Sequence, residues 1–344
     1  MDKTSQQAVD AMLACLSVRD EQTRGVVHRP LHLIWVGGPK LGAMYAENLK
    51  MFALVHAGPT SPVMVWSNEL SDEFVDRVGA EADAVRASAP RKHPTTQTPS
   101  KHLHLVRYDL EELMRGYPGH GVAKTIATLG KQRDQRKLFI VHLSDLLRYF
   151  LVWRFGGFYA DLDILPLRPL LSFPPGWISV DTPDTSNTTC VRPSAFYRSL
   201  ELTCLCNGLL TFNRGDPLLR AVLETAHTFF PHPQYGYHYG VIGALLIMYR
   251  LRELGDGYGE LYPVTGDYAM CNAFKDLYPD TTVDDALVAR LARKCSVAHV
   301  YGQGQSDKEV TGGERSLLGR LYARVRKQLA SGDGVLRDYR YGVS

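Results

Sequence analysis

The sequence of 344 residues contains little cysteine and tryptophan and has no strong excess of charge of either sign. Its net charge is +3 at pH 7, which is too small to indicate a nucleic-acid-binding surface. No two cysteines have CxxC spacing, so the usual zinc-binding pattern is excluded and free thiols are the simplest interpretation. The six cysteines are Cys15, Cys190, Cys204, Cys206, Cys271 and Cys295.

Long apolar runs are also absent. The longest, Gly240 to Tyr249, has about half of the roughly 20 residues that a membrane-spanning helix needs. The first 20 residues have no continuous apolar core of the kind found in secretory signals. We therefore expect no membrane span and a cytoplasmic location.

What is present is an ordinary globular composition in which short β-like runs alternate with helical patterns, and this predicts an α/β fold around a central sheet. The expected strands are residues 31–36, 62–66, 103–108, 158–160, 205–212 and 295–300. The clearest expected helices are residues 144–155, 217–230, 241–254 and 316–330. We divide the chain into an N-terminal helical segment (1–26), a catalytic domain (27–312) and a basic amphipathic C-terminal helix and tail (313–344).

One segment combines a strongly apolar pattern with charged residues. The run SDLLRYFLVWRF at 144–155 is apolar on nearly every side, which predicts a buried helix with Ser144 as N-cap and Gly156-Gly157 as its end. A short strand follows and leads directly to Asp161 and Asp163. The two aspartates therefore lie where a strand leaves the sheet, which is where ligands bind in open α/β sheets.

Asp161 and Asp163 are two residues apart, so in extended chain their side chains would point to the same side and could reach one ligand. Carboxylate oxygens suit Mn²⁺ or Mg²⁺, and such a cation would neutralise the charge on a departing diphosphate. The alternative is a pair that caps a turn. Two acids in so apolar a segment would be costly to bury without a partner, which favours the functional interpretation.

Asp145 and Arg148 are three residues apart on the predicted helix and share one face. They are either a structural ion pair or, because a guanidinium suits phosphate oxygens, part of the same site.

The segment SDLLRYFLVWRFGGFYADLDILPL resembles the signature of the DXD-containing sugar transferases, which include family 32 glycosyltransferases and the clostridial glucosylating toxins. The earlier LHLIWVGG resembles the strand that opens their catalytic domains. The resemblance implies a GT-A-like nucleotide-sugar-binding fold, with a single central mixed sheet flanked by helices. It also implies metal-dependent hexose transfer with retention of anomeric configuration.

By motif position, the resemblance implies that Asp163 binds the metal directly and that Asp161 contacts the ribose and sugar hydroxyls beside it. It implies that Asp145 and Arg148 hold the donor sugar and diphosphate. Many relatives carry a late histidine followed by Ser-Trp. His299 is the candidate here for a further metal ligand, although Ser-Trp does not follow it, and the alternative is a histidine that merely ends a strand.

The same resemblance gives candidates for the donor pocket. It implies that Trp35 stacks on the nucleobase, that Val36 and Gly37 line the pocket beside it, and that Tyr159 is a neighbour. Asn207 lies on a strand that resembles the donor-proximal strand of the family, but a core or turn amide is an equal alternative.

The expected partner is a nucleotide-sugar donor, with a uridine diphosphate sugar favoured. The acceptor, a glycan, lipid or protein, is not indicated, and residues 182–192 and 231–239 are where an acceptor pocket would form. Two alternatives remain open: a sugar-nucleotide-binding protein without activity, and a phosphatase of the haloacid dehalogenase type, which also carries Asp-x-Asp after a strand.

The C-terminal pattern places apolar residues on one helical face with arginine and lysine around it. This helix could lie peripherally on an anionic membrane, but packing onto the domain is the favoured interpretation.

Overall fold

The structure is a computed structural model that describes residues 29–58, 61–88, 98–132, 136–170, 173, 175–180, 205–231, 241–253, 271–272, 285–286, 288–289, 296–299 and 316–331. The predicted N-terminal helical segment lies outside these ranges. So do both predicted domain boundaries.

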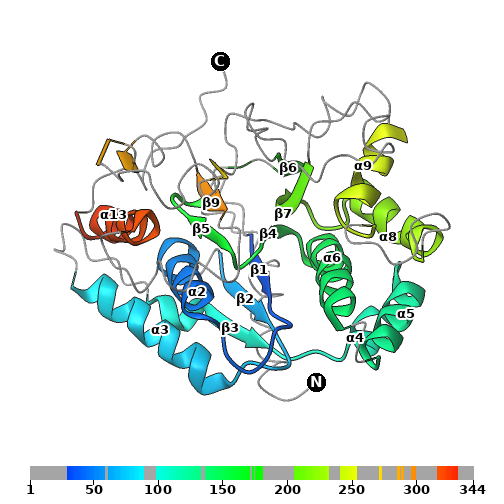
Figure 1. The fold of residues 1–344 in the computed structure, drawn as a ribbon, viewed down its shortest axis with the longest axis horizontal. Coiled ribbons are helices and arrows are strands. Elements are labelled where there is room, and N and C mark those ends of the chain that lie inside the picture. Colours follow the sequence, from blue (N-terminus) through cyan, green and yellow to red (C-terminus); the bar gives the residue numbers. More distant parts are fainter. Residues whose placement is uncertain are drawn as a thin grey trace, which may run out of the picture.

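A central sheet of six strands forms the middle of the molecule, in the order β3-β2-β1-β4-β7-β6 (Figure 1). Strands β1 to β4 are parallel to their neighbours, whereas β7 runs antiparallel to β4 and β6 antiparallel to β7. The strands are β1 (Leu31–Ile34), β2 (Val63–Trp66), β3 (Leu103–Val106), β4 (Gly157–Ala160), β6 (Trp177–Val180) and β7 (Leu205–Phe212). The predicted α/β fold with a central mixed sheet is confirmed.

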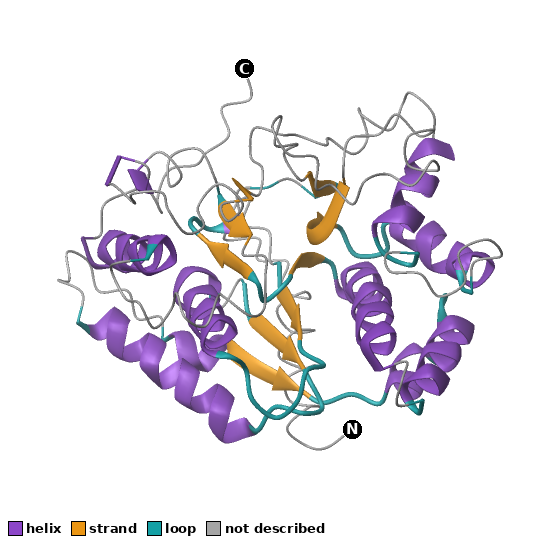
Figure 2. Ribbon diagram, viewed as in Figure 1, coloured by secondary structure: helices purple, strands orange, loops and turns teal. Residues whose placement is uncertain are grey.

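Helices cover both faces of this sheet (Figure 2). On one side lie α2 (Ala43–His56), α3 (Asp72–Ala87) and α13 (Leu317–Ser331). On the other lie α4 (Leu110–Met114), α5 (His120–Gly130), α6 (Arg136–Phe155), α8 (Pro217–Phe229) and α9 (Ala244–Glu253). A short 3₁₀ helix, Pro99–His102, leads into β3.

The strands are buried on both faces, as expected when helices cover a parallel sheet on both sides. In β2, for example, Val63 and Val65 belong to the core under α2 and α3, whereas Met64 and Trp66 belong to the core under α6. Every residue of β1, β2 and β4 is buried. Strand β1 is shorter than predicted and ends at Ile34, so Trp35 and Val36 lie in the loop beyond it.

The prediction that Ser144 caps a helix is wrong. Helix α6 begins at Arg136, and Ser144 lies in its middle. The apolar pattern continues upstream through Phe139 and Leu143, so nothing in the chain stops the helix at Ser144. The other end is as predicted: Gly156 and Gly157 have positive φ angles of 72° and 92°, which glycine adopts readily.

A second, smaller sheet was not predicted. It contains β5 (Ile164–Pro166), β9 (Val297–His299) and β8 (Cys271–Asn272), in the order β5-β9-β8. Ile164 of β5 pairs with His299 of β9, and the two strands run antiparallel. This pairing brings residues near the end of the chain beside the Asp161–Asp163 turn.

Helix α13 packs onto the domain, as the favoured interpretation of the C-terminal pattern predicted. Its Leu318, Leu321 and Val325 are buried in the same core as β1 and α2. Among the described residues, no helix is both long enough and apolar enough to cross a membrane.

Candidate active site

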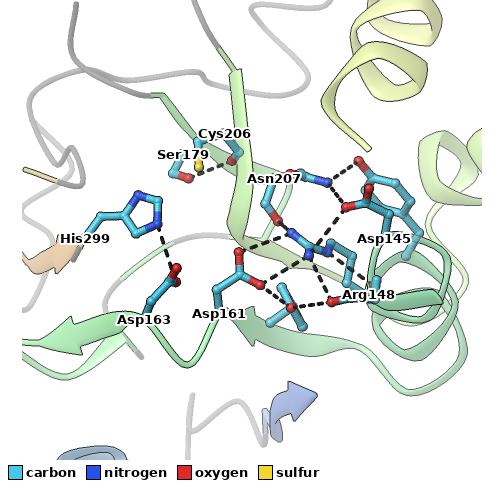
Figure 3. Close-up of polar contacts among 11 residues, drawn as sticks. Asp145, Arg148, Asp161, Asp163, Ser179, Cys206, Asn207 and His299 are labelled. Carbon is cyan, nitrogen blue, oxygen red and sulfur yellow. Dashed lines mark hydrogen bonds and ion pairs between the residues drawn. The ribbon is translucent and has the colours of Figure 1, made fainter. Parts of the chain in front are cut away.

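Asp161 and Asp163 lie in a turn between β4 and β5, at the edge where the parallel strands end. The backbone N–H of Ile164 donates to the carbonyl of Asp161 (3.1 Å), which closes the turn. The expectation that the pair lies in extended chain with both side chains on one side is therefore wrong. Figure 3 shows Asp161 pointing towards Arg148 and Asp163 pointing towards His299.

The carboxylate of Asp161 is held by two neighbours. Arg148 Nη2 lies 3.2 Å from its Oδ1, and the hydroxyl of Tyr159 donates a short hydrogen bond to the same oxygen. Burial raises the pKa of Asp161 to about 6, and the Asp163 charge adds to this, while Arg148 acts in the opposite direction. Asp161 is therefore oriented by the protein before any ligand binds.

Arg148 has protein partners on all three of its nitrogens. Nε donates to the Ser144 carbonyl (3.3 Å), Nη1 to the Asn207 carbonyl (2.8 Å) and Nη2 to the Ser144 hydroxyl (3.0 Å). Its guanidinium carbon also lies 4.6 Å from the centre of the Tyr159 ring. Burial alone would lower the pKa of Arg148, but Asp161, Tyr159 and Asp145 together raise it, so the guanidinium stays charged.

Asp145 is joined to β7 through Asn207. The Asn207 side-chain amide donates to Asp145 Oδ1 (2.8 Å) and to the Tyr149 hydroxyl (3.3 Å). That hydroxyl in turn donates to the Gly243 carbonyl (2.9 Å). Arg148 Nη2 lies 3.4 Å from the same oxygen of Asp145. The structure therefore brings Asp145, Arg148, Tyr159, Asp161 and Asn207 into one connected network (Figure 3).

Asp163 and His299 form a separate pair beside this network. His299 Nε2 lies 3.4 Å from Asp163 Oδ1, and the side chains are 5% and 29% exposed, respectively. Within the described part of the chain, Asp163 Oδ1 is buried and makes no hydrogen bond. A buried carboxylate oxygen without a donor is costly unless a cation meets it, so this pair fits a divalent ion.

The protein alone does not complete a metal site. Among the described residues, no three or more histidine, cysteine, aspartate or glutamate side chains are grouped so as to hold an ion. Both oxygens of Asp161 face Arg148, which lies 3.4 Å from Oδ2 through Nη1. A cation at Asp163 would therefore need ligands from a bound substrate, and diphosphate oxygens commonly supply them.

The loop after β1 lies at the same edge, because β1 and β4 are parallel neighbours. Trp35 is partly buried, and its indole N–H donates to the Gly38 carbonyl (2.8 Å). A Cβ at Gly37 would lie 2.5 Å from the indole, so only glycine allows the loop to fold this closely over Trp35. Val36 packs partly against the core on the α6 side.

Two glycines and one serine were missed as contributors. A Cβ at Gly208 would lie 2.7 Å from Asp161 Oδ2, and a Cβ at Gly243 would lie 2.7 Å from Asp145 Oδ2. A glycine inside a strand pattern signals close approach of another group, and Gly208 carried that signal. Ser144, expected only as a cap, instead bonds Arg148 and lies 3.4 Å from the Tyr159 hydroxyl.

Several candidate regions lie outside the described residues. They are the proposed acceptor segment 182–192, nearly all of 231–239, and the glycine-rich run 301–304 that follows His299.

Residues 45–182 match the family model for the glycosyltransferase sugar-binding region containing a DXD motif. The matched region holds Asp145, Arg148, Tyr159, Asp161 and Asp163. The resemblance to DXD-containing sugar transferases that the sequence showed is thereby confirmed. No curated protein sequence matched the chain.

Three solved structures are remotely similar. The PaToxG glycosyltransferase has 12% identity and a TM-score of 0.43, covering 94% of this chain and 96% of that one. The galactosyltransferase LgtC, solved with donor and acceptor sugar analogs, has 14% identity and a TM-score of 0.37, covering 88% and 95%. The bifunctional glycosyltransferase WbbM has 12% identity and a TM-score of 0.33, covering 87% and 50%.

Proposed function

We propose that this chain, a DXD-type glycosyltransferase by the family match of residues 45–182, transfers a hexose from a nucleotide sugar with the help of a divalent cation. A uridine diphosphate sugar is the proposed donor, and the transfer retains anomeric configuration. The observation that supports this best is the buried, unpaired Oδ1 of Asp163 beside the network that orients Asp161. The acceptor is a glycan, lipid or protein.

In this proposal Asp163 and His299 hold Mn²⁺ or Mg²⁺. When bound, the cation supplies Lewis-acid stabilisation of the charge that develops on the leaving diphosphate. Asp161, at the same turn, contacts the ribose and sugar hydroxyls. It does so from an orientation that Arg148 and Tyr159 fix in advance, so little entropy is lost on binding.

The remaining residues of the network orient the donor. We assign to Asp145 the donor-sugar hydroxyls through Oδ2, because Oδ1 is already taken by Asn207 and Arg148. Arg148 was expected to hold diphosphate, but each of its nitrogens already has a protein partner. Its proposed role is therefore to position Asp145 and Asp161. Trp35, with Val36 and Gly37, forms the nucleobase side of the pocket.

The test is donor hydrolysis, which needs no acceptor. The protein is incubated with a panel of nucleotide sugars in Mn²⁺, Mg²⁺ or EDTA, and the free sugar released is measured together with its anomeric configuration. We expect one uridine diphosphate hexose to be hydrolysed with retention, in Mn²⁺ but not in EDTA. A donor that binds but stays intact under every condition would indicate a sugar-nucleotide-binding protein instead.

A further inference from the structure

A buried asparagine supports the Asp161–Asp163 turn from behind. Asn48 of α2 is fully buried, and its side-chain Nδ2 donates to the carbonyl of Leu162, the residue between the two aspartates (2.8 Å). Leu162 is itself 4% exposed and packs in the core beneath the turn. Asn48 therefore fixes the backbone from which both carboxylates project.

The orientation of the Asn48 amide is set from the C-terminal helix. The carbonyl of Leu162 can only accept, so Nδ2 must face it and Oδ1 must face the other way. There the Tyr322 hydroxyl of α13 donates to Oδ1 (2.6 Å). Tyr322 is 2% exposed, and burial raises its pKa well above the usual value, so its hydroxyl keeps the proton that it donates.

Further contacts hold Tyr322 in this position. Helix α13 lies beside α2 (Figure 1), and its Leu318, Leu321 and Val325 are buried in the shared core. One turn after Tyr322, the guanidinium of Arg326 makes a short ion pair with Glu47 of α2. The two bonds from Tyr322 to Asn48 and from Asn48 to Leu162 thus form a continuous buried path from α13 to the turn.

We propose that Asn48 and Tyr322 are positioning residues for the DXD turn, so that the C-terminal helix is part of the machinery that sets the donor site. The proposal rests on the proposed function, because it assumes that the turn binds the donor and its cation. It assigns to α13 a role that the packing of its apolar face alone would not require. Supporting groups behind metal ligands commonly alter metal affinity or activity by about 10- to 100-fold when removed.

The test compares Tyr322→Phe with Val325→Ala. Tyr322→Phe removes one hydroxyl and keeps the ring, whereas Val325→Ala loosens the same helix without touching the path. The first measurement is amide hydrogen exchange of residues 161–165 in the protein without donor or metal. We expect faster exchange of the Ile164 amide in Tyr322→Phe, and exchange like that of the wild type in Val325→Ala.

The second measurement is the Mn²⁺ concentration that gives half-maximal donor hydrolysis. We expect it to rise about tenfold in Tyr322→Phe and to stay unchanged in Val325→Ala. Asn48→Ala should have at least the effect of Tyr322→Phe, and the double variant should be no worse than Asn48→Ala, because both break one path.

Equal exchange at the turn in Tyr322→Phe and the wild type would overturn the proposal, as would equal changes in the two single variants of α13. The exchange measurement needs no activity. If the wild-type protein hydrolyses no donor, the proposed function fails, while the exchange data still decide whether the path holds the turn.

Discussion

His299 Nε2 lies 3.4 Å from Oδ1 of Asp163, and the pairing of β5 with β9 is what brings them together. The histidine is 5% exposed, so it is held by the second sheet and not by solvent-facing chain. The contact places an imidazole beside the carboxylate that the motif marks as the metal ligand. It supports the interpretation of His299 as part of the site over that of a histidine that merely ends a strand.

The first prediction concerns the charge of Asp163. Asp163→Asn removes one charged ligand without changing side-chain volume, so donor hydrolysis should fall by about 100-fold or more, the scale on which one electrostatic group contributes. Thermal melting should change little. Asp161→Asn should also reduce turnover but leave some Mn²⁺ activation. The control is Asp76→Asn on the exposed face of α3; a folded Asp163→Asn protein with full activity would contradict the assignment.

The second prediction concerns His299. Because imidazole favours Mn²⁺ over Mg²⁺, His299→Ala should weaken Mn²⁺ activation by about tenfold or more and narrow the difference between the two ions. Activity is titrated with each ion in the wild type, in His299→Ala and in His227→Ala, which changes an exposed histidine of α8. Superimposable titration curves for His299→Ala and the wild type would remove His299 from the site.

Much of the fold could be predicted from the sequence, because its strands are short apolar runs that end at glycine, proline or polar residues. The Leu205–Phe212 strand agrees with the prediction at both ends, and so does the stop of α6 at Gly156. The start of α6 was missed because an apolar pattern has no cap where the helix continues. The turn at Asp161–Asp163 was missed because spacing alone cannot distinguish extended chain from a turn.

The site was predicted where a local motif carried it and missed where contacts are distant in sequence. Asp145, Arg148, Asp161 and Asp163 lie in one segment, and the structure brings them together. By contrast, Asn48 contacts the turn from α2, and the approach of Gly243 to Asp145 depends on how α9 packs. Such contacts follow from tertiary packing, which one sequence does not reveal.

The third prediction concerns Trp35. An indole stacked on a base contributes roughly 1–3 kcal/mol, so Trp35→Ala should raise the donor Michaelis constant about tenfold or more, and Trp35→Phe should have a milder effect. Trp35 is only partly buried, so the melting temperature should fall modestly. Donor titration and thermal melting are measured on the same variants. A large loss of stability with unchanged donor affinity would show that Trp35 is a core residue.

The fourth prediction concerns acid stability and His32, which is fully buried in β1. Its Nε2 lies 3.1 Å from the Gly156 carbonyl, and its Nδ1 accepts from the Trp66 indole (3.1 Å), an arrangement that requires the neutral ring. Burial lowers the pKa of His32 to about 4, whereas the unfolded chain takes up this proton near pH ~6.5. Between these values the unfolded state binds more protons, so stability falls as the pH falls.

This effect should cost about 2 kcal/mol between pH 7 and pH 5. Denaturant unfolding is measured at both pH values for the wild type and for His32→Gln, whose side chain does not titrate. The variant should be less stable at pH 7 but should lose correspondingly less stability on acidification. Equal losses in the two proteins would show that His32 does not contribute to the acid sensitivity.

The last prediction concerns Gly208, which lets β7 approach the DXD turn. The backbone N–H of Asp161 donates to the Gly208 carbonyl (2.7 Å), so the glycine cannot move away from the turn without breaking that bond. A Cβ at this position would meet Asp161 Oδ2 at 2.7 Å and Cys206 Sγ at 3.3 Å. The Asp161 side chain, already held by Arg148 and Tyr159, would have to shift. Misplacement of a reacting group by about 1 Å can cost on the order of 100-fold in rate.

Gly208→Ala should therefore lower donor turnover by about that factor while the protein remains folded. Gly121→Ala in α5 is the matched control, because a Cβ there meets nothing within 4 Å. It should leave activity unchanged and, as alanine favours helix over glycine by up to ~1 kcal/mol, should not lower the melting temperature. Turnover, the donor Michaelis constant and melting are measured for both variants. If Gly208→Ala were as active as Gly121→Ala, the orientation of Asp161 imposed by β7 would not matter for the reaction.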